Sequence, residues 1–290
     1  MIVTSLLVGY VLGQALDGNS TIRGKTEDSE IVIVTTSRCA GAIHSLIWRG
    51  HEFLDSYDHS RQLQSASNLD LGTPITGETY NPTEAGSRDD GAGAKSTSQL
   101  LSIRAKGNRL ETNSKMAFWL APGEDSGGNP AKNTTKLSNH LLHKVVKIGA
   151  RGRPHLISYD VTFSLPKDEV HTAAVFEALT GYMPAEFSRF WRFDPDSQSL
   201  KPLSDGPGEQ PQPVILATED GAYAMGIYSP DPQTKGYGRF RFPVEQVVKW
   251  NCVFRVANPK PGGVYQYHHL VAVGTLNQVQ EEMKLLTKSR

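Results

Sequence analysis

The sequence predicts an all-β protein, a large antiparallel β-sandwich with a short C-terminal helix. Three observations favour this class: many short segments rich in β-branched and aromatic residues, turn residues between nearly all of them, and one helical pattern near the end. The chain has 290 residues, and β-sandwiches of about 200–250 residues often form one unit. We therefore expect a single domain over residues 19–290.

The first 18 residues differ in character from the rest. They contain an apolar run from Leu6 to Leu12, followed by small and polar residues. This order is typical of a short secretory signal, although the only positive charge before the run is the amino terminus, and a leading strand is the alternative. Sequons at Asn19 and Asn133 are compatible with export. We expect a secreted protein with no membrane span, because no later run is long enough.

Composition limits the partners. Lysine and arginine balance aspartate and glutamate, so the formal net charge is zero and the pI is about 7.1. Nothing here predicts a basic surface for nucleic acid or anionic lipid, so nucleic acid is not an expected partner. The two cysteines, Cys39 and Cys252, either form one disulfide in an oxidising compartment or remain two buried thiols.

The strands are predicted from their composition and alternation. Residues 31–35 and 40–48 are apolar, and Arg49-Gly50 then indicates a tight hairpin into residues 51–54. From Ile157 to Leu165 every second residue is apolar, which predicts a half-buried strand. Further strands are expected at residues 99–105, 110–120, 143–148, 170–179, 214–218, 222–228, 246–256 and 265–274.

Two connectors and one helix complete the prediction. Residues 122–130 and 202–213 are rich in proline and glycine, so we expect no regular structure there, and we interpret the second as a surface loop rather than an interdomain linker. Thr275 and Gln278 resemble a capping box. Apolar residues then recur at helical spacing, at Leu276, Val279, Met283 and Leu286.

Polar side chains are concentrated in residues 57–90, where carboxylates, amides, a guanidinium, an imidazole and a phenol stand close together. Such planar donors and acceptors suit a polyhydroxylated ligand such as a sugar. In an extended strand His59 and Arg61 would share one face and Gln62 and Gln64 the other, unless a bulge at Ser60 merged them. The alternative is a solvated edge strand. The candidate residues are His59, Arg61, Gln62, Gln64, Glu78, Tyr80, Asn81 and Glu84.

Glu78 and Glu84 are the candidate pair for proton transfer. They lie in a segment that Asn81-Pro82 and Gly86 predict to be a loop. Acid and base chemistry at a sugar ring requires one protonated and one ionised carboxyl group. The alternative is a solvent-exposed acidic loop balanced by Arg88.

Two aromatic segments offer further contacts. In a strand, Tyr265, Tyr267 and His269 share one face and His268 the other. Residues 181–195 place several aromatic rings around Arg189 and Arg192, and there Arg189 and Trp191 are candidates for stacking on or clamping a sugar. The alternative for these rings is the hydrophobic core.

Recognised metal and cofactor motifs are absent from the sequence. No HExxH, CxxC pair or calcium-loop pattern occurs, and the apolar residues around His140 and His143 favour a strand over a zinc-binding helix. GxSxG, Walker and dinucleotide patterns are also missing. We therefore expect neither a metal nor a cofactor, and a cation held by Glu78, Glu84 and loop carbonyls is the alternative.

Residues 39–64, CAGAIHSLIWRGHEFLDSYDHSRQLQ, and the ending HHLVAVGTLNQVQEEM resemble galactose mutarotase-like supersandwich proteins. The resemblance covers about a quarter of the chain. It implies a large antiparallel sandwich whose concave face binds sugar. Mutarotases of this group use a histidine acid, a glutamate base and an arginine. Arg61 is the best positional match, whereas the histidine and the glutamate have no secure counterpart.

Together these patterns lead to one functional hypothesis and two alternatives. We expect a secreted enzyme that cleaves glycosidic bonds of a poly- or oligosaccharide by hydrolysis or by uronate elimination. Glu78 and Glu84 would transfer protons, assisted by His59 or His269, and Tyr265 or Tyr267 would replace them in a lyase. Sugar contacts would come from Arg61, Gln62, Gln64, Tyr80, Asn81, Tyr265, Arg189 and Trp191. The alternatives are a non-catalytic carbohydrate-binding module and an aldose 1-epimerase.

Overall fold

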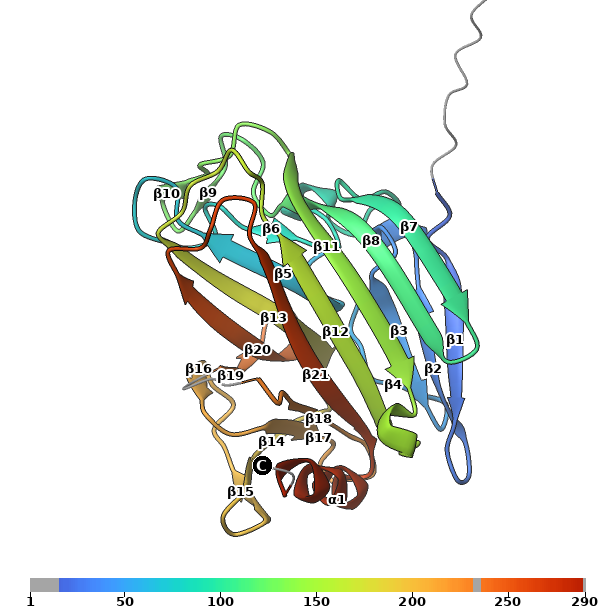
Figure 1. Cartoon of the computed structure of the whole chain (residues 1–290). Helices are drawn as coiled ribbons and strands as arrows, with labels where there is room; N and C mark the ends of the chain where they lie inside the picture. The colour runs from blue at the N-terminus through green and yellow to red at the C-terminus, as the bar shows by residue number, and fades with distance from the viewer. Residues whose placement is uncertain (1–15, 232–235, 289–290) are drawn as a thin grey trace, which may run out of the picture.

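The computed structural model describes residues 16–231 and 236–288, and these form an all-β architecture with one α-helix (Figure 1). The predicted fold class is confirmed. Nearly all of the predicted signal segment, including Leu6 to Leu12, lies outside the described residues. In the part of the chain that is described, no helix has the length and apolar character needed to cross a bilayer.

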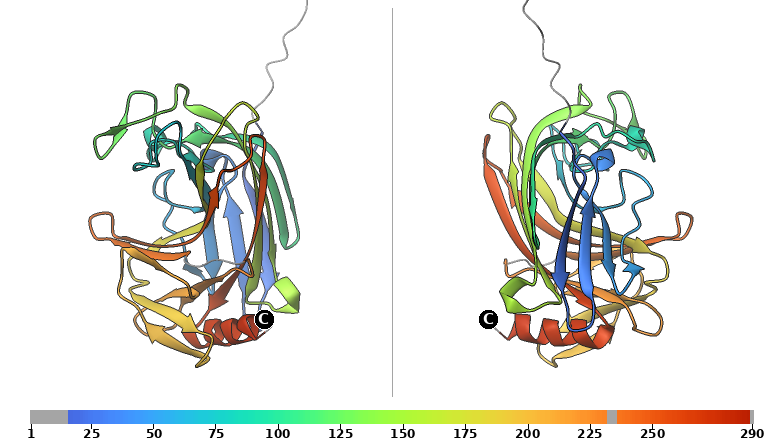
Figure 2. Two further views of the ribbon diagram at one scale, coloured as in Figure 1. Left: turned by 60° about the vertical axis from the view of Figure 1, so that its left-hand side comes forward. Right: turned by 90° about the vertical axis from the view of Figure 1, so that its right-hand side faces the viewer.

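Within the described residues, nineteen strands form one continuous sheet that folds into two layers (Figures 1 and 2). One layer has the spatial order β1 (Ser20–Lys25), β2 (Glu30–Thr35), β3 (Ile43–Trp48), β5 (Leu63–Leu69), β13 (Ala173–Pro184), β20 (Val247–Ala257), β19 (Tyr237–Phe242) and β16 (Gly208–Gln210).

The other layer continues with strands from the middle and the end of the chain. Its order is β7 (Gln99–Lys106), β8 (Arg109–Phe118), β11 (Leu137–Ile148), β12 (Leu156–Ser164), β21 (Val264–Gly274), β18 (Ala224–Tyr228), β17 (Val214–Ala217), β14 (Arg189–Asp194) and β15 (Ser199–Pro202). The short strand β6 (Pro82–Thr83) pairs with both β5 and β8 and so joins the layers, while β4 (His51–Glu52) pairs with β3.

Alternating burial along the strands builds the core between the layers. On β12, Ile157, Tyr159, Val161 and Phe163 are buried, as their spacing predicts. Large rings from the facing layer, such as Trp250, fill the space between them. Strands with this alternation, such as β12, present their other set of side chains to the outside, whereas β17 and β18 are buried on both faces.

The C-terminal helix α1 (Leu276–Thr287) begins at Thr275, which forms the predicted capping box with Gln278. Its apolar side packs on β18 and β21 and buries Val279, Met283 and Leu286. The helix closes the lower end of the sandwich beneath the β14, β17 and β18 strands (Figure 1). The helix prediction is confirmed.

Three local predictions are wrong. Residues 122–130 contain a two-stranded hairpin of β9 (Asp125–Ser126) and β10 (Asn129–Pro130), because Gly127 and Gly128 adopt the positive φ that a tight turn requires. Residues 202–213 include β16, which pairs with the edge of β19. Residues 57–62 form turns, so β5 begins only at Leu63.

Both cysteines are buried and they are not joined in a disulfide. Burial raises the pKa of the Cys39 thiol to about 11, so it stays protonated at neutral pH. Of the two sequons, the Asn133 side chain is buried and donates to the carbonyls of Leu120 and Thr135. A glycan therefore has no access to Asn133 in this fold.

Candidate active site

A cavity of about 550 Å³ lies on the face of β13, β20 and β19 that is turned away from the core. On β13, Phe176 points into the core and Glu177 points out, and on β20 the same alternation leaves Lys249 between the buried Val248 and Trp250. Loops around residues 58–61, 78, 87–91 and 119 form the opposite wall. A smaller recess at its inner end is lined by Gln64, Asn81, Thr83 and Thr180.

Glu177 and Lys249 form an ion pair across two neighbouring strands. The Lys249 ammonium lies 2.9 Å from Glu177 Oε2, and it also lies over the rings of Tyr182 and Phe240, at 5.1 and 5.4 Å. Burial opposes the ionisation of Glu177, but the charge and hydrogen bond of Lys249, together with the Asn251 hydrogen bond and the Arg255 charge, outweigh burial and hold the pKa of Glu177 below its ordinary value. Glu177 is therefore a carboxylate at neutral pH.

Glu78 reaches the same cavity from the loop that follows β5. Its side chain is exposed at the mouth of the cavity, and partial desolvation of the carboxyl group by the lining raises the pKa of Glu78 above its ordinary value. The negative charge of Glu177 acts in the same direction, whereas Lys249 opposes it. The cavity thus contains two carboxyl groups whose pKa values are moved in opposite directions.

Aromatic rings form the apolar part of the lining. Tyr182, Phe240 and Phe242 come from β13 and β19, and Trp119 comes from the loop after β8. Phe242 is nearly parallel to Phe240, with ring centroids 6.2 Å apart, and to Tyr182, at 6.5 Å. The rings therefore present a flat apolar surface next to the two carboxyl groups.

Cations and an imidazole surround the mouth. Arg61 lies 3.5 Å from Asp55 and 3.4 Å from Asp58, and Arg88 lies 2.8 Å from Glu124. His59 is buried in the wall, where its two ring nitrogens lie 2.7 and 2.6 Å from the carbonyl oxygens of Gly91 and Arg38. Since both nitrogens are engaged, His59 positions the loop that carries Arg61.

The two predicted glutamines have different roles. Gln64 lines the inner recess, where its amide donates to Ser60 O at 2.9 Å and accepts from Ala85 N at 3.0 Å. Gln62 is fully buried beneath the loop, and its amide donates to the carbonyl of Asp58 at 2.5 Å. Neither glutamine lies on a regular strand face with His59, because the chain turns between them.

Glu84 does not line the cavity, which corrects the expectation that it pairs with Glu78. Its carboxylate is buried between the layers, where it forms an ion pair with the fully buried Lys144 of β11. Ser65 N donates to it at 3.1 Å and the Tyr159 hydroxyl at 3.4 Å. A glutamate with these partners has no solvent or ligand to act on.

The predicted face of β21 exists, but it faces the core. Tyr267 stacks on Phe254 with centroids 4.1 Å apart, Tyr265 stacks on Phe176 at 5.1 Å, and burial raises the pKa of Tyr267. His269 is buried, its Nδ1 lies 3.1 Å from Tyr159 O, and burial lowers the pKa of His269 to about 4. None of the three lines the cavity, so phenolate chemistry there has no tyrosine from β21.

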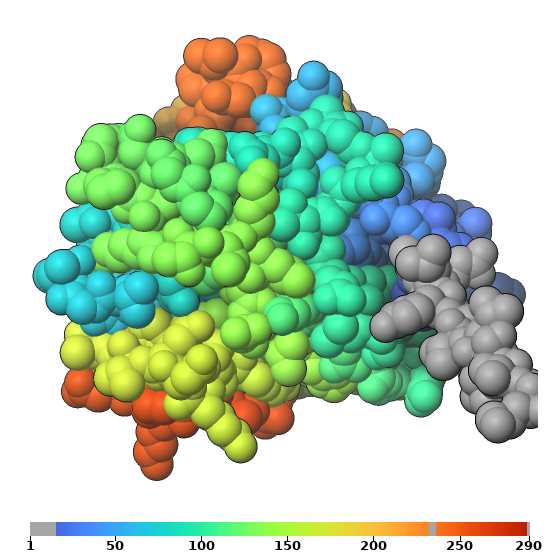
Figure 3. Space-filling model, turned by 90° about the horizontal axis from the view of Figure 1, so that it is seen from above, coloured from blue at the N-terminus to red at the C-terminus, as the bar shows by residue number. Residues whose placement is uncertain are grey.

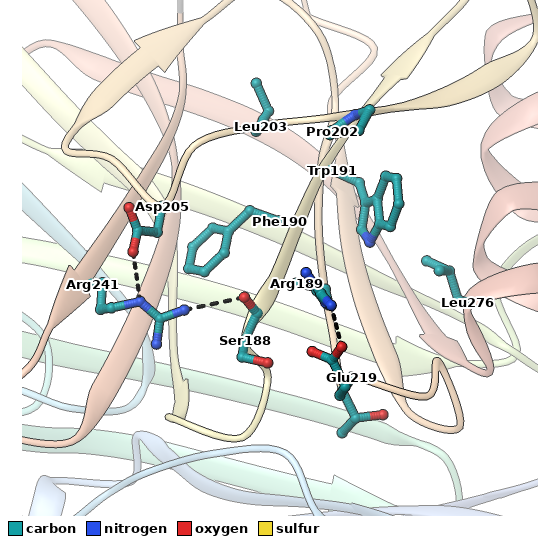
Figure 4. Close-up of a pocket in the computed structure, with 11 residues that line it drawn as sticks. Ser188, Arg189, Phe190, Trp191, Pro202, Leu203, Asp205, Glu219, Arg241 and Leu276 are labelled. Atoms are coloured by element: carbon teal, nitrogen blue, oxygen red, sulfur yellow. Dashed lines mark hydrogen bonds and ion pairs between the residues drawn. The ribbon is translucent and has the colours of Figure 1, made fainter.

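Arg189 and Trp191 lie in a different cavity of about 570 Å³, formed around β14 at the lower end of the molecule (Figure 4). Arg189 pairs with Glu219, and Arg241 pairs with Asp205 at 2.8 Å. Every cation shown in Figure 4 thus has an acidic partner. Because the first cavity has the two carboxyl groups with opposed pKa shifts, we regard it as the candidate active site.

Tyr80 also lies away from the cavity. Its ring is buried against Phe118, at 4.6 Å between centroids, and against His140 and His171. Of the sequence-predicted residues, the structure brings together Glu78, His59, Arg61, Gln64 and Asn81.

Glu177, Lys249 and Trp119 were missed because the segments that contain them look like ordinary apolar strands or turns. A signal was present: AVFEALT and VVKWN each carry one charged residue in the middle of an apolar strand. Such a residue must face a polar space or a partner.

Comparison with known proteins yields matches only among solved structures. No family model and no curated protein matches the chain. A galactose mutarotase related enzyme from Lactobacillus acidophilus is 11% identical, with 89% of this chain and 97% of that chain covered at a TM-score of 0.49. An α-galactosidase from Lactobacillus brevis is also 11% identical, with 91% of this chain and 41% of that chain covered at a TM-score of 0.48.

A third solved structure is the heparan sulfate lyase HepC from Pedobacter heparinus, 11% identical, with 93% of this chain and 37% of that chain covered at a TM-score of 0.43. The matching structures thus include galactose mutarotase-like proteins, as the resemblance in the sequence suggested, together with α-galactosidases and a heparan sulfate lyase. At these TM-scores the likeness concerns the general course of the chain. The functional proposal below is therefore argued from the side chains of the cavity.

Proposed function

We propose that the cavity binds a saccharide and that Glu78 and Glu177 act as acid and base at a glycosidic bond. The observation that carries this proposal is the position of two carboxyl groups in one cavity, Glu177 paired with Lys249 at 2.9 Å and Glu78 with no lysine or arginine of the described residues within ion-pair distance. The opposed directions of their pKa shifts agree with it. Enzymes that need a carboxylic acid beside a carboxylate separate their pKa values in this way. The proposal replaces Glu84 with Glu177 as the partner of Glu78.

The rest of the lining supports a sugar as the ligand. The rings of Trp119, Tyr182, Phe240 and Phe242 offer apolar faces, and sugar rings have apolar faces that stack on such surfaces. The donors and acceptors of the recess, including Gln64 and Asn81, suit hydroxyl groups. An uncharged sugar agrees with this lining because Lys249, Arg61 and Arg88 already have acidic neighbours.

In the proposed reaction, Glu78 in its protonated form donates to the glycosidic oxygen as the bond to the anomeric carbon breaks. Glu177 stabilises the positive charge that develops on the sugar ring and then accepts a proton from the water that attacks the anomeric carbon. In the other route, Glu177 attacks that carbon as a nucleophile, and water, whose proton passes to the Glu78 carboxylate, then hydrolyses the resulting glycosyl ester. Lys249 keeps Glu177 ionised before either step. Hydrolysis is favoured over elimination, since burial raises the pKa of Tyr182 and so disfavours a phenolate base in the cavity.

The test is to incubate the protein with a panel of oligo- and polysaccharides and to follow reducing ends, unsaturated uronates and optical rotation. We expect reducing ends from at least one substrate, and a rate lower by about 10²–10⁴-fold in Glu78→Gln and in Glu177→Gln. Glu281→Gln, on the exposed side of α1, is the matched control and should leave the rate unchanged.

The other outcomes separate the alternatives. Interconversion of anomers without cleavage would identify an epimerase, and binding without any product would identify a carbohydrate-binding module. Unchanged turnover in both glutamine variants would overturn the assignment of acid and base. Export is part of the same proposal, and the check is whether the protein appears in the medium of its host cell with its first residues removed.

A further inference from the structure

A second cluster of reactive side chains lies at the upper end of the sandwich, outside the candidate active site. His140 Nε2 lies 2.8 Å from Glu169 Oε2, and His171 Nε2 lies 3.1 Å from the same oxygen. One ligand atom from each of the three side chains lies within 4.8 Å of the others. Both histidines are buried and Glu169 is partly exposed, at 16%, so the cluster is reached from solvent past Glu169.

Two parts of the chain supply the three side chains of this cluster, and a third part lies beside it. His140 is on the inward face of β11, whereas Glu169 and His171 are two residues apart in the loop between β12 and β13. In the view from above, this loop (yellow-green to yellow) lies against the loop that follows β5 (cyan) (Figure 3). The Tyr80 hydroxyl from that second loop is a hydrogen-bond neighbour of Glu169. The cluster therefore joins β11 to two loops.

The surroundings fix the orientation of His171. Its Nδ1 donates to the carbonyl oxygen of Asp70, which leaves Nε2 turned toward Glu169. The Asp70 carboxylate is held in turn by the backbone nitrogens of Thr172 and Ala173, at 2.8–3.1 Å. Histidine ligands of metals usually have such a partner on the other ring nitrogen, because the partner selects the tautomer with a free lone pair.

We propose that His140 Nε2, His171 Nε2 and the Glu169 carboxylate bind one divalent cation, with Zn²⁺ as the preferred ion. Two imidazoles and one carboxylate are a common zinc ligand set, with bonds of about 2.0–2.2 Å and a fourth position for water. A tetrahedral ion with such bonds needs ligand atoms about 3.3 Å apart. The two nitrogen-to-oxygen distances of 2.8 and 3.1 Å would widen by a few tenths of an ångström, and the two imidazole nitrogens, which lie within 4.8 Å of each other, would settle at that spacing through rotation of the side chains.

The charge of the cluster also fits a cation. Glu169 is its only charged ligand, and the carboxylates of Asp70 and Asp168 are further negative groups in its surroundings. The ion would tie β11 to the loop between β12 and β13, and the Tyr80 ring packs beside both histidines. The inference does not depend on what the cavity binds.

The test uses the full chain, stripped with EDTA, dialysed, and then exposed to Zn²⁺. We expect about one zinc per chain after removal of excess metal, and a higher Tm than that of the stripped protein. His140→Ala and Glu169→Gln should lose both effects. His143→Ala is the matched control, because His143 lies on the same strand but faces outward beside Glu111, and it should retain both.

A second measurement covers variants that fail to fold. Co²⁺ added to the stripped wild-type chain should give the visible absorption of a four-coordinate nitrogen and oxygen site, and Zn²⁺ should abolish this absorption. Uptake of Mn²⁺ in preference to Zn²⁺ would overturn the choice of ion. Failure of the wild type to retain Zn²⁺, or equal retention by His140→Ala, would overturn the site.

Discussion

Glu78 and Glu84 are six residues apart, yet they stand in two regions with opposite properties. Glu78 lies in an open cavity beside Glu177 and Lys249, while Glu84 lies between the layers beside Lys144. In both regions a lysine neutralises a glutamate. In the cavity the side chains remain accessible, with 11% of Lys249 and 30% of Glu177 exposed, whereas Lys144 is 0% exposed.

The comparison teaches that the surroundings of an ion pair decide its role. A pair that solvent and ligands can reach is able to exchange protons, so its pKa values matter for chemistry. A sealed pair cannot, and its main effect is on stability, because either partner alone would be a buried uncompensated charge. The following experiments test this difference, beginning with the largest expected effect.

Lys144→Met should destabilise the protein by about 3–5 kcal/mol, because it leaves the Glu84 carboxylate buried without its counter-ion. Urea denaturation measures this change. The double variant Glu84→Gln with Lys144→Met should recover much of the loss, since no net charge remains in the core. A single variant within about 1 kcal/mol of the wild type would contradict the sealed-pair interpretation.

His269→Gln should remove a pH dependence of stability that belongs to the core. The pKa of His269 is lowered from 6.5 to about 4, so the unfolded state takes up the proton first as pH falls. Above pH 6.5 His269 makes its full contribution to the free energy of unfolding of the wild type. This contribution falls by about 3 kcal/mol as the pH is lowered from 6.5 to about 4. Urea midpoints across this window, compared between the two proteins, provide the check. If the urea midpoints of the wild type and of His269→Gln changed equally with pH, the prediction would be wrong.

Lys249→Met should alter activity more than stability, in contrast to Lys144→Met. Without the Lys249 charge, the pKa of Glu177 rises, so the acid limb of the pH–rate profile moves to higher pH. The free energy of unfolding should fall by less than in Lys144→Met, because Glu177 is 30% exposed and its carboxylate keeps contact with water. An unmoved acid limb, in a variant that still turns over substrate, would exclude Glu177 as the group that must be ionised.

Trp119→Ala should weaken saccharide binding by about 0.5–1.5 kcal/mol through the loss of ring stacking. Calorimetric titration of a substrate or of a binding-only ligand measures the change in Kd. Trp191→Ala is the matched control, because Trp191 lines the cavity around β14, and its Kd should equal that of the wild type. A loss confined to Trp191→Ala would move the sugar to that second cavity.

Much of the fold was predictable because its signals are local. The alternation of residues 157–165 and the Thr275–Gln278 cap each depend on a few neighbouring residues, and both appear as predicted. The hairpin at residues 125–130 was missed since its strands are only two residues long, and turn-rich composition obscured them.

The candidate site was predictable only in part, because the direction in which a side chain points depends on where the chain turns. Glu78 and Arg61 reach the cavity, but Glu84, which comes directly after β6, lies in the core. Nothing within ten residues of Glu84 reveals Lys144, which is 60 positions away along the chain. Glu177 and Lys249 are also far apart in the sequence, so their pairing across β13 and β20 could not be predicted from local patterns.

The inward face of β11 carries polar residues at His140 and Lys144, with Leu142 and Val146 alternating between and after them. A slip of two residues keeps every side chain on its own face, so the apolar positions alone hardly distinguish the two alignments. Such a slip moves each group by about 7 Å. Both His140 and Lys144 would then lose their acidic partners at once. These two residues therefore favour one register of β11 against its neighbouring strands.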